Sequence, residues 1–167
     1  MNKKRLISDS IDARNYRFLI KLEATLFVAY VLIFSFVFTI IFWNMMDIAY
    51  LALIIAISLF LIIHIPMLLS DIYHLWKITA RSNKYIFAHT VLSNPIYKSL
   101  GGFYFSVNVQ DEIGNIHTGE TAAIYTTIKN PYLEEWKDKK VLAAYDPETQ
   151  KVFVIGLKKD FPDIPAN

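Results

Sequence analysis

The stretch ATLFVAYVLIFSFVFTIIFW, Ala24 to Trp43, contains no charged residue over twenty positions. As an α-helix it is about 30 Å long, which is the thickness of the hydrocarbon core of a bilayer. Four residues later, IAYLALIIAISLFLIIHIPMLL, Ile48 to Leu69, repeats this pattern over twenty-two positions. The sequence therefore predicts a helical hairpin with two transmembrane helices within residues 24–76.

The charges that flank these two runs predict the orientation of the hairpin. Residues 1–21 carry six Lys or Arg and two Asp, a net charge of +4 (6 − 2), and Lys77, Arg81 and Lys84 follow the second run. The step between the runs has no basic residue. Because Lys and Arg are retained on the cytoplasmic side, we expect both termini in the cytoplasm of a bacterial cell.

Aromatic residues at the ends of the two runs predict the membrane interfaces. Tyrosine and tryptophan favour the headgroup region, where the ring is half in contact with apolar groups and half hydrated. This preference places Trp43 and Tyr50 at the outer interface and Tyr73 and Trp76 at the inner one.

Small residues in the second run predict helix packing. Ala49, Ala52 and Ala56 recur at helical spacing, and small residues let backbones approach closely in lipid. We expect this face to pack on the first span. The alternative is packing on a partner protein or on a second copy of the chain.

Three ionisable residues, His64, Asp71 and His74, gather near the cytoplasmic end of the second run. A metal or proton site is one interpretation. Two His and one Asp without a further ligand favour the simpler one, in which His64 bonds a backbone carbonyl and the others lie among the headgroups. The chain has no cysteine, which excludes thiolate catalysis and disulfides. We expect no catalytic residue, no cofactor and no metal.

After Asn83 the sequence changes to alternating apolar and polar residues, the pattern of strands with one buried face. Phe103, Phe105, Val107 and Val109 share one such face. Strands are predicted over 85–92, 103–110, 116–128, 141–145 and 151–157, with a turn at 111–115, a bulge at Gly119 and a short helix after Asn130-Pro131.

This order of elements predicts a small all-β or α+β domain over residues 84–157. A helix between the third and fourth of five strands is the layout of an OB-like five-stranded barrel, and an SH3-like barrel is the alternative. Residues 1–23 are interpreted as a basic cytoplasmic segment and residues 158–167 as an extended tail.

Parts of this domain resemble a bacterial family of unknown function. The similar stretches are FYFSVNV at Phe103 to Val109, the turn at Gly114, and VLAAYDP at Val141 to Pro147. Members of that family attach one or two membrane spans to a small β domain with a late Tyr-Asp-Pro turn. Lys140 departs from the family, which often has glycine there. The plan is also similar to NfeD-like membrane-anchored OB domains, and neither resemblance implies a catalytic residue.

Function is constrained mainly by what the sequence lacks. It has no nucleophile elbow, Walker loop or His-Glu-x-x-His motif, and His117 and Thr118 in the run HTGE fall on opposite faces of a strand. From Lys84 onward nine Lys face ten Asp or Glu, a balance of −1 (9 − 10) that argues against nucleic-acid binding.

We therefore expect a non-catalytic membrane protein whose β domain contacts another membrane or membrane-associated protein. Exposed strand edges invite pairing, so Tyr97, Gly101 and Gly102 are the candidate contact residues. Apart from this partner and membrane lipids, a homo-oligomer is possible. Two alternatives stand beside this expectation: an immunity-type protein that neutralises a membrane-acting toxin, and assembly through the hairpin with a regulatory β domain.

Overall fold

The computed structural model describes residues 2–44, 47–97, 102–111, 113–122, 124–125 and 136–161, without the side chains of 42–44, 47–48 and 124–125. The chain divides into two compact units. One is helical and consists of Asn15–Lys77. The other is a β domain to which both Met1–Arg14 and Ile78–Asn167 belong.

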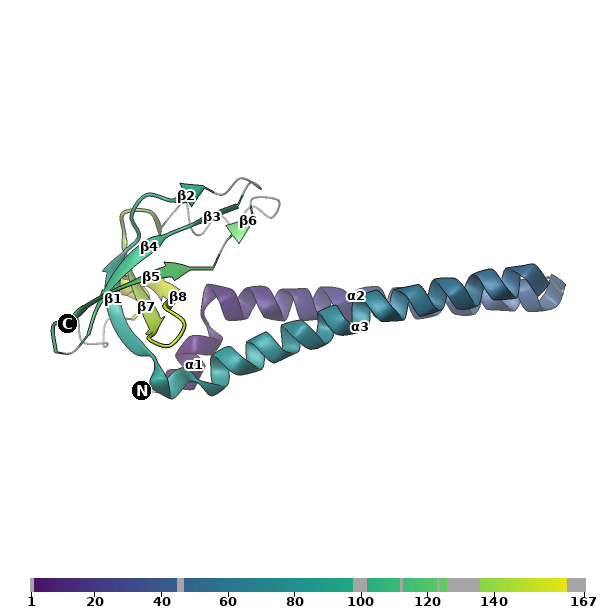
Figure 1. The fold of residues 1–167 in the computed structure, drawn as a ribbon, viewed down its shortest axis with the longest axis horizontal. Helices are drawn as coiled ribbons and strands as arrows, with labels where there is room; N and C mark the ends of the chain where they lie inside the picture. The colour runs from purple at the N-terminus through teal and green to yellow at the C-terminus, as the bar shows by residue number, and fades with distance from the viewer. Residues whose placement is uncertain are drawn as a thin grey trace. The chain divides into compact units, whose positions relative to one another are not determined.

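Two long helices form the helical unit (Figure 1). Helix α2 spans Ile11–Asn44 and helix α3 spans Asp47–Ala80. Contacts between aromatic rings join the two helices at several levels. Tyr30 of α2 stacks on Phe60 of α3 with ring centroids 4.0 Å apart, and Phe38 of α2 packs edge-to-face on Tyr50 of α3 with ring centroids 5.8 Å apart. The predicted helical hairpin is therefore present, and both helices extend beyond the predicted apolar runs.

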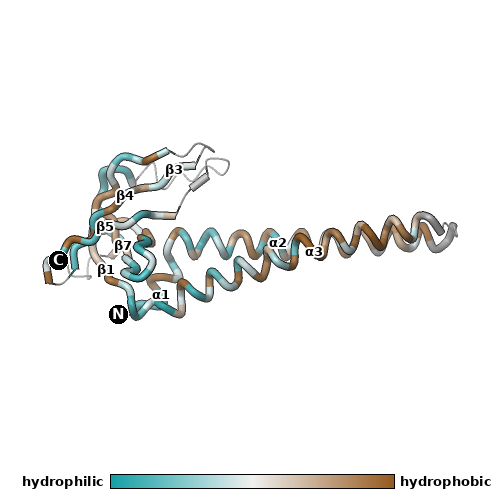
Figure 2. Tube along the Cα trace, in the orientation of Figure 1, coloured by the Kyte–Doolittle hydropathy of each residue, from teal (hydrophilic) through white to brown (hydrophobic). Residues whose placement is uncertain are grey.

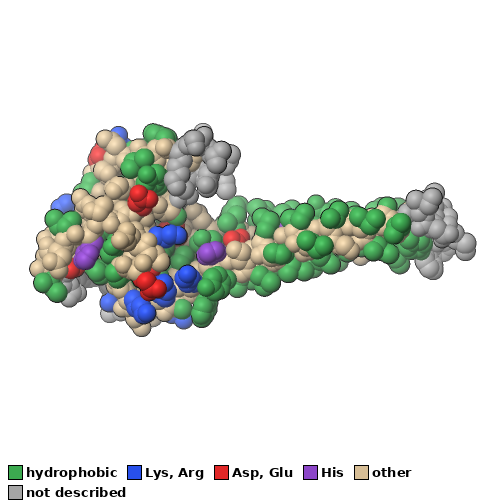
Figure 3. All heavy atoms as spheres, viewed as in Figure 1, with side chains coloured by type: hydrophobic (Ala, Val, Ile, Leu, Met, Phe, Trp, Pro, Cys, Tyr) green, Lys and Arg blue, Asp and Glu red, His purple; other side chains and the backbone are tan. Residues whose placement is uncertain are grey.

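The outward surface of the helical unit is apolar. Both helices are long and apolar enough to cross a membrane, and outward side chains such as Phe36 are 69% exposed. Figure 2 shows hydrophobic residues along the helices toward the turn that joins them, and Figure 3 shows hydrophobic side chains along their visible face. A helix in a soluble core would bury such side chains, so this surface fits a membrane protein.

The described residues of the β domain form two sheets. A five-stranded sheet has the order β1-β7-β8-β5-β4, in which only β5 and β8 pair in parallel, and a three-stranded sheet has the order β2-β3-β6. The described strands are β1 (Ile86–Val91), β2 (Ile96–Tyr97), β3 (Gly102–Tyr104), β4 (Ser106–Gln110), β5 (Ile116–Thr121), β6 (Ile124–Tyr125), β7 (Lys140–Asp146) and β8 (Lys151–Leu157).

The five-stranded sheet curls until it nearly closes. Its two end strands, β1 and β4, are linked by the Thr90 hydroxyl, which donates a hydrogen bond to the backbone carbonyl of Asn108 at 2.7 Å. The inner face of the sheet holds the main core, to which Phe105, Val107 and Trp136 belong. The result is a barrel-like sheet, as the sequence predicts.

Strands β7 and β8 are buried on both faces. Val141 and Ala143 point into the main core, whereas Leu142 and Ala144 join an outer cluster with Phe153. This two-sided burial explains why both strands are continuous apolar runs instead of alternating ones. Two 3₁₀ turns lie at the borders of the domain, η1 (Ser82–Lys84) before β1 and η2 (Lys158–Asp160) after β8.

A short helix before the first span belongs to the β domain. Helix α1 spans Lys3–Ser8, and its Leu6 and Ile7 are buried in the outer cluster. Ser10 then caps α2, because its hydroxyl accepts a hydrogen bond from the Ala13 N–H at 3.2 Å. Segments on both sides of the helical pair therefore build one domain, which the sequence pattern did not reveal.

Several details differ from the predicted strands. The strand expected over 103–110 is interrupted at Phe105, and the strand expected over 116–128 is described as β5 and β6. The bulge predicted at Gly119 is wrong: Gly119 pairs in register with Val107, and the irregularity lies between Leu142 and Ala143. The helix predicted after Asn130-Pro131 falls largely outside the described residues.

Candidate functional site

The turn between β4 and β5 is organised by one carboxylate. Asp111 Oδ1 accepts hydrogen bonds from the N–H groups of Ile113 at 3.0 Å and Asn115 at 2.8 Å. Its Oδ2 accepts from Asn115 Nδ2 and lies 3.0 Å from His117 Nε2. Gly114 completes the turn with φ +94°, a backbone conformation that glycine adopts without strain. The predicted turn at 111–115 is therefore confirmed at its described residues.

His117 connects this turn to the barrel. Its ring stacks on Tyr145 with centroids 5.2 Å apart, and Tyr145 is part of the main core. The hydrogen bond with His117 is the main cause that holds the pKa of Asp111 well below its usual range. Thr118 is exposed and bonds Asn108 across the sheet, so the predicted opposite faces of the HTGE run are confirmed.

The Asp111–His117 pair resembles part of a catalytic relay, but its partners are structural. The carboxylate is occupied by the turn, and the imidazole rests on an aromatic ring. Within the described part of the chain, no three His, Cys, Asp or Glu side chains come together as metal ligands. The arrangement therefore rigidifies the turn more readily than it performs chemistry.

A second polar cluster joins the end of α3 to the turn between β7 and β8. Asp146 is buried and accepts hydrogen bonds from Arg81 Nη2 at 3.2 Å, from the Glu148 N–H at 3.1 Å and from the Thr149 hydroxyl at 2.8 Å. Arg81 also bonds the exposed Glu148 carboxylate. The turn that contains Tyr-Asp-Pro thus binds the side chain of Arg81, the residue that follows α3, and we call this set of contacts the clamp.

Tyr85, the residue between η1 and β1, adds to this polar cluster. Its hydroxyl donates a hydrogen bond to the carbonyl of Ile78 at 3.0 Å. Burial raises the pKa of Tyr85 to about 12, and the nearby Asp146 carboxylate contributes to the rise. The phenol therefore stays protonated at physiological pH and keeps this hydrogen bond.

The helical unit contains a polar contact that the sequence pattern missed. Glu23 is buried, and its Oε2 lies 2.7 Å from Nδ1 of His64 on the other helix. His64 also packs on Phe60 with ring centroids 4.3 Å apart. In the sequence, the visible signs of this contact were a single Glu next to the first apolar run and a single His inside the second. The sequence pattern does not show that they meet, because this depends on how the two helices align along their lengths.

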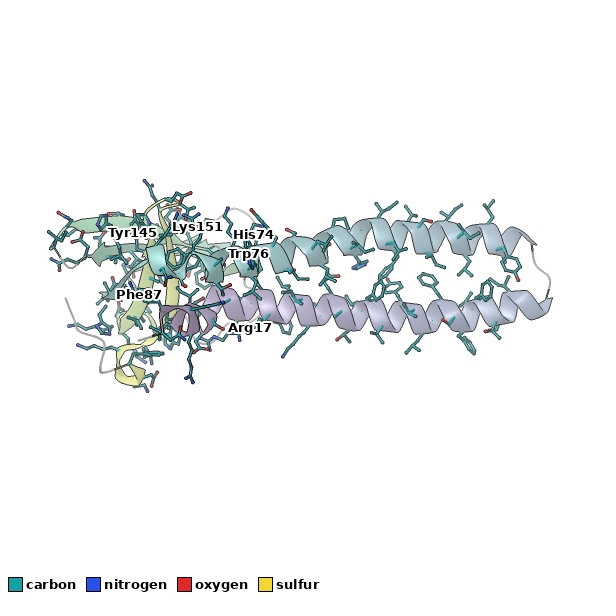
Figure 4. All side chains as sticks on the ribbon, turned by 90° about the horizontal axis from the view of Figure 1, so that it is seen from below. Arg17, His74, Trp76, Phe87, Tyr145 and Lys151 are labelled. Carbon is teal, nitrogen blue, oxygen red and sulfur yellow. The ribbon has the colours of Figure 1, made fainter. Side chains whose placement is uncertain are left out.

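Of the other two members of the predicted polar group, His74 has a different stacking partner. His74 stacks on Tyr16 with centroids 5.6 Å apart, and Figure 4 shows it on α3 together with Trp76. Over the residues whose placement is described, His64, Asp71 and His74 do not form a group that holds a metal ion.

Helix packing in the hairpin differs from the expected alanine face. Ala52 and Ala56 are exposed, whereas Leu53 and Phe60 are buried. Large side chains, not small ones, fill the space between α2 and α3, and beside them lies a groove of about 460 Å³. The expected packing of the alanine face on the first span is therefore wrong for Ala52 and Ala56, because the interhelical contact is aromatic. Their packing on a partner or a second copy stays a prediction.

The remaining predicted site residues are partly described. Tyr73 and Trp76 are exposed, Tyr50 and Ala49 are partly exposed, and the side chain of Trp43 lies outside the description. The position of these aromatic residues at the membrane interfaces stays a prediction. Tyr97 is 74% exposed on the edge strand β2, and Gly102 is buried in β3. Gly101 lies outside the described residues. The structure thus places Tyr97, but not Gly102, on the surface.

His89 on β1 is a half-buried histidine, and both of its ring nitrogens are buried without a hydrogen-bond partner among the described residues. Burial lowers its pKa, and the positive charges of Lys158 and Lys140 lower it further. The imidazole is therefore neutral in the folded protein.

This environment predicts a loss of stability in mild acid. Because the pKa of His89 is lower in the folded state than in the unfolded state, its contribution is fully present above the unfolded value of about 6.5 and falls as the pH drops below it. We expect His89→Leu to stabilise the β domain by about 1 kcal/mol at neutral pH and to flatten its pH profile between 7 and 5. Urea unfolding of the full chain in detergent, followed by hydrogen exchange in β1, measures both effects. An unchanged pH profile in the variant would contradict the assignment.

Comparison of the chain with protein-family models, with curated proteins and with solved structures finds no match. The two resemblances stated from the sequence therefore remain predictions, and the functional argument depends on the geometry alone.

Proposed function

We propose that this chain is a non-catalytic membrane protein whose two spans hold a cytoplasmic β domain as a protein-interaction module. The observation that carries the proposal is that Met1–Arg14 and Ile78–Asn167 belong to one compact domain. If α2 and α3 cross the membrane, the two ends of the hairpin must be on the same side. The excess of Lys and Arg at those ends supports the cytoplasmic side.

The attachment of the domain to its anchor supports the same function. Ile11, in the first turn of α2, is part of the barrel core, and Arg81, just after α3, is bound by the buried Asp146. Both spans therefore lead directly into the packed domain. A domain confined in this way is concentrated near membrane partners, which raises the effective concentration of its binding surface.

The strand order supports an OB-like barrel for this module. The strands of the five-stranded sheet follow the chain order β1, β4, β5, β7, β8. In the sheet, β1 is linked to β4 through Thr90 but pairs with β7, and β5 pairs in parallel with β8 instead of with β7. A simple meander does not produce this order, whereas a Greek-key barrel of the OB type does. We infer the OB-like plan rather than the SH3-like one.

The orientation can be tested with single cysteines, because the natural chain has none. Lys4→Cys, Asn44→Cys and Thr118→Cys place a thiol before the hairpin, at its turn and on the β domain. We expect a membrane-impermeant maleimide to label only position 44 in intact cells and all three after permeabilisation. Labelling of position 118 in intact cells would overturn the cytoplasmic assignment.

The interaction function requires a second experiment. Because the domain needs both chain segments, only Asn15–Lys77 is replaced by an unrelated two-span hairpin, and crosslinked partners are compared with those of the natural chain. We expect the same protein partner from both chains. A partner recovered only with the natural hairpin would instead favour assembly through the spans, the function for which the outward Ala52 and Ala56 are candidates.

A further inference from the structure

The turn between β4 and β5 displays two isoleucines to solvent. Ile113 is 88% exposed, more than any large apolar side chain of the described helices, and Ile116 is 69% exposed. Single exposed apolar residues are common on protein surfaces. Two exposed β-branched side chains three residues apart, Ile113 on the turn and Ile116 at the first position of β5, form a more unusual, concentrated apolar tip.

The same turn is held rigidly. In addition to the contacts of Asp111 described above, the Gly114 N–H donates to the Asp111 carbonyl at 3.1 Å, and the Asp111 N–H donates to the Asn115 carbonyl at 3.0 Å. Gln110 Nε2 donates to the Gly114 carbonyl at 3.3 Å. The isoleucines are therefore presented on a preorganised backbone, which lowers the entropy lost when a binding partner covers them.

Charge distinguishes a protein pocket from a lipid surface as the target. The β4–β5 hairpin, Ser106 to Thr121, has no Lys or Arg, and Asp111 lies at its turn. Glu120, at the far end of β5, lies opposite Lys151 of β8. The cytoplasmic leaflet is negatively charged and attracts basic segments, so an acidic apolar tip is not suited to insert there. A protein pocket with apolar walls and a basic rim complements it.

We propose that the β4–β5 turn is the partner-binding element of the domain and inserts Ile113 and Ile116 into an apolar pocket with a Lys- or Arg-rich rim on a protein partner. This inference depends on the proposed function and names its contact surface. It moves the contact from the predicted Tyr97 edge to a turn that the sequence pattern marked only as a hairpin. Buried aliphatic anchors surrounded by a polar rim are the usual arrangement of such interfaces.

A photocrosslinking residue at Thr118 tests the proposal in the membrane-bound full chain. Thr118 is exposed and lies two positions from Ile116, so both side chains point to the same face of β5. A probe at Val91, which is 44% exposed on β1, is the control position. We expect the probe at Thr118, but not the probe at Val91, to form a covalent adduct with a protein. The crosslinked positions on that protein should lie next to Lys or Arg side chains.

Serine variants provide the matched comparison in the Thr118 probe background. Ile113→Ser and Ile116→Ser should each lower the adduct yield about tenfold, because each removes a buried aliphatic side chain from the interface, and Val91→Ser should leave the yield unchanged. The yield should also fall with increasing salt. Because both isoleucines are strongly exposed, we expect neither serine variant to alter folding, and unchanged hydrogen exchange in β4 checks this.

The possible failures are distinguishable. Adducts with phospholipid or with a second copy of the chain, or a yield insensitive to both serine variants, overturn the proposed surface. If the chain with the replaced hairpin still recovers a partner that Ile113→Ser does not affect, the interaction module stands and the turn is not its contact. If neither chain recovers a partner through the β domain, the proposed function and this inference fail together.

Discussion

Asp146→Ala will destabilise the β domain by about 3 kcal/mol, because it removes the buried carboxylate that pairs with the largely buried Arg81 guanidinium and leaves it only the exposed Glu148 carboxylate. Arg81 has a side-chain exposure of 17%, and its Nε has no hydrogen-bond partner among the residues that the structure describes. The substitution also removes the acceptor for the Glu148 N–H and the Thr149 hydroxyl. The Asp146-Pro147 turn and the residue after α3 should loosen together.

Hydrogen exchange of the full chain in detergent, measured by mass spectrometry, resolves this effect by segment. Faster exchange is expected first in η1, the start of β1 and the turn between β7 and β8. Glu148→Gln is the matched control: its carboxylate bonds the same Arg81 but is 65% exposed, so its removal should change stability by less than about 1 kcal/mol. Equal effects of the two variants would show that the buried pair does not hold the clamp.

Gly119→Ala will destabilise the barrel by about 1 to 3 kcal/mol through overpacking. A Cβ at this position would lie 2.8 Å from the carbonyl oxygen of Gln150, 2.8 Å from Val152 Cγ2 and 2.9 Å from Tyr145 Cε2. The side chains can shift, but the Gln150 carbonyl accepts a hydrogen bond from the Glu120 N–H at 3.1 Å and cannot move without disturbing β5 and β8. The parallel pairing of these strands is therefore the most sensitive part.

Urea unfolding of the full chain in detergent, with hydrogen exchange in β5 and β8, measures this change. Thr118→Ala is the matched control, since it alters the neighbouring residue on the exposed face and leaves the inner side of the sheet intact. We expect the control to remain within about 0.5 kcal/mol of the natural chain. A Gly119→Ala variant as stable as the control would mean that the sheet relaxes around the added methyl group.

These two residues show different degrees of predictability. Gly119 was recognisable as unusual inside an alternating strand pattern. A glycine at such a position is expected both for a β-bulge and for the close approach of another strand, so the sequence does not distinguish the two. Only the position of Gln150, which directly precedes the neighbouring strand β8, distinguishes them. Asp146 was recognised as a turn residue, yet its contact with Arg81 spans 65 positions of sequence and follows from the fold alone.

For the candidate contact surface too, one part was predictable from local sequence and another was not. Local patterns predicted the turn that carries Ile113, because glycine and Asp-Asn chemistry mark a hairpin within a few residues. The same patterns did not show how exposed Ile113 is, since exposure depends on which segments cover a turn. Glu23 was missed for a related reason: its partner His64 lies on another helix, and one residue of helical rotation would separate them.

The sequence alone determined the two apolar helices, the strand periods of the β domain and the turn at Gly114, because length, hydropathy and backbone preferences act locally. The tertiary structure decided that Met1–Arg14 packs with the β strands, that the five-stranded sheet nearly closes with one parallel pair, and that Arg81 meets Asp146. These features join residues that are far apart in the chain. Their formation depends on shape complementarity and on the burial of paired polar groups, which no local pattern of residues encodes.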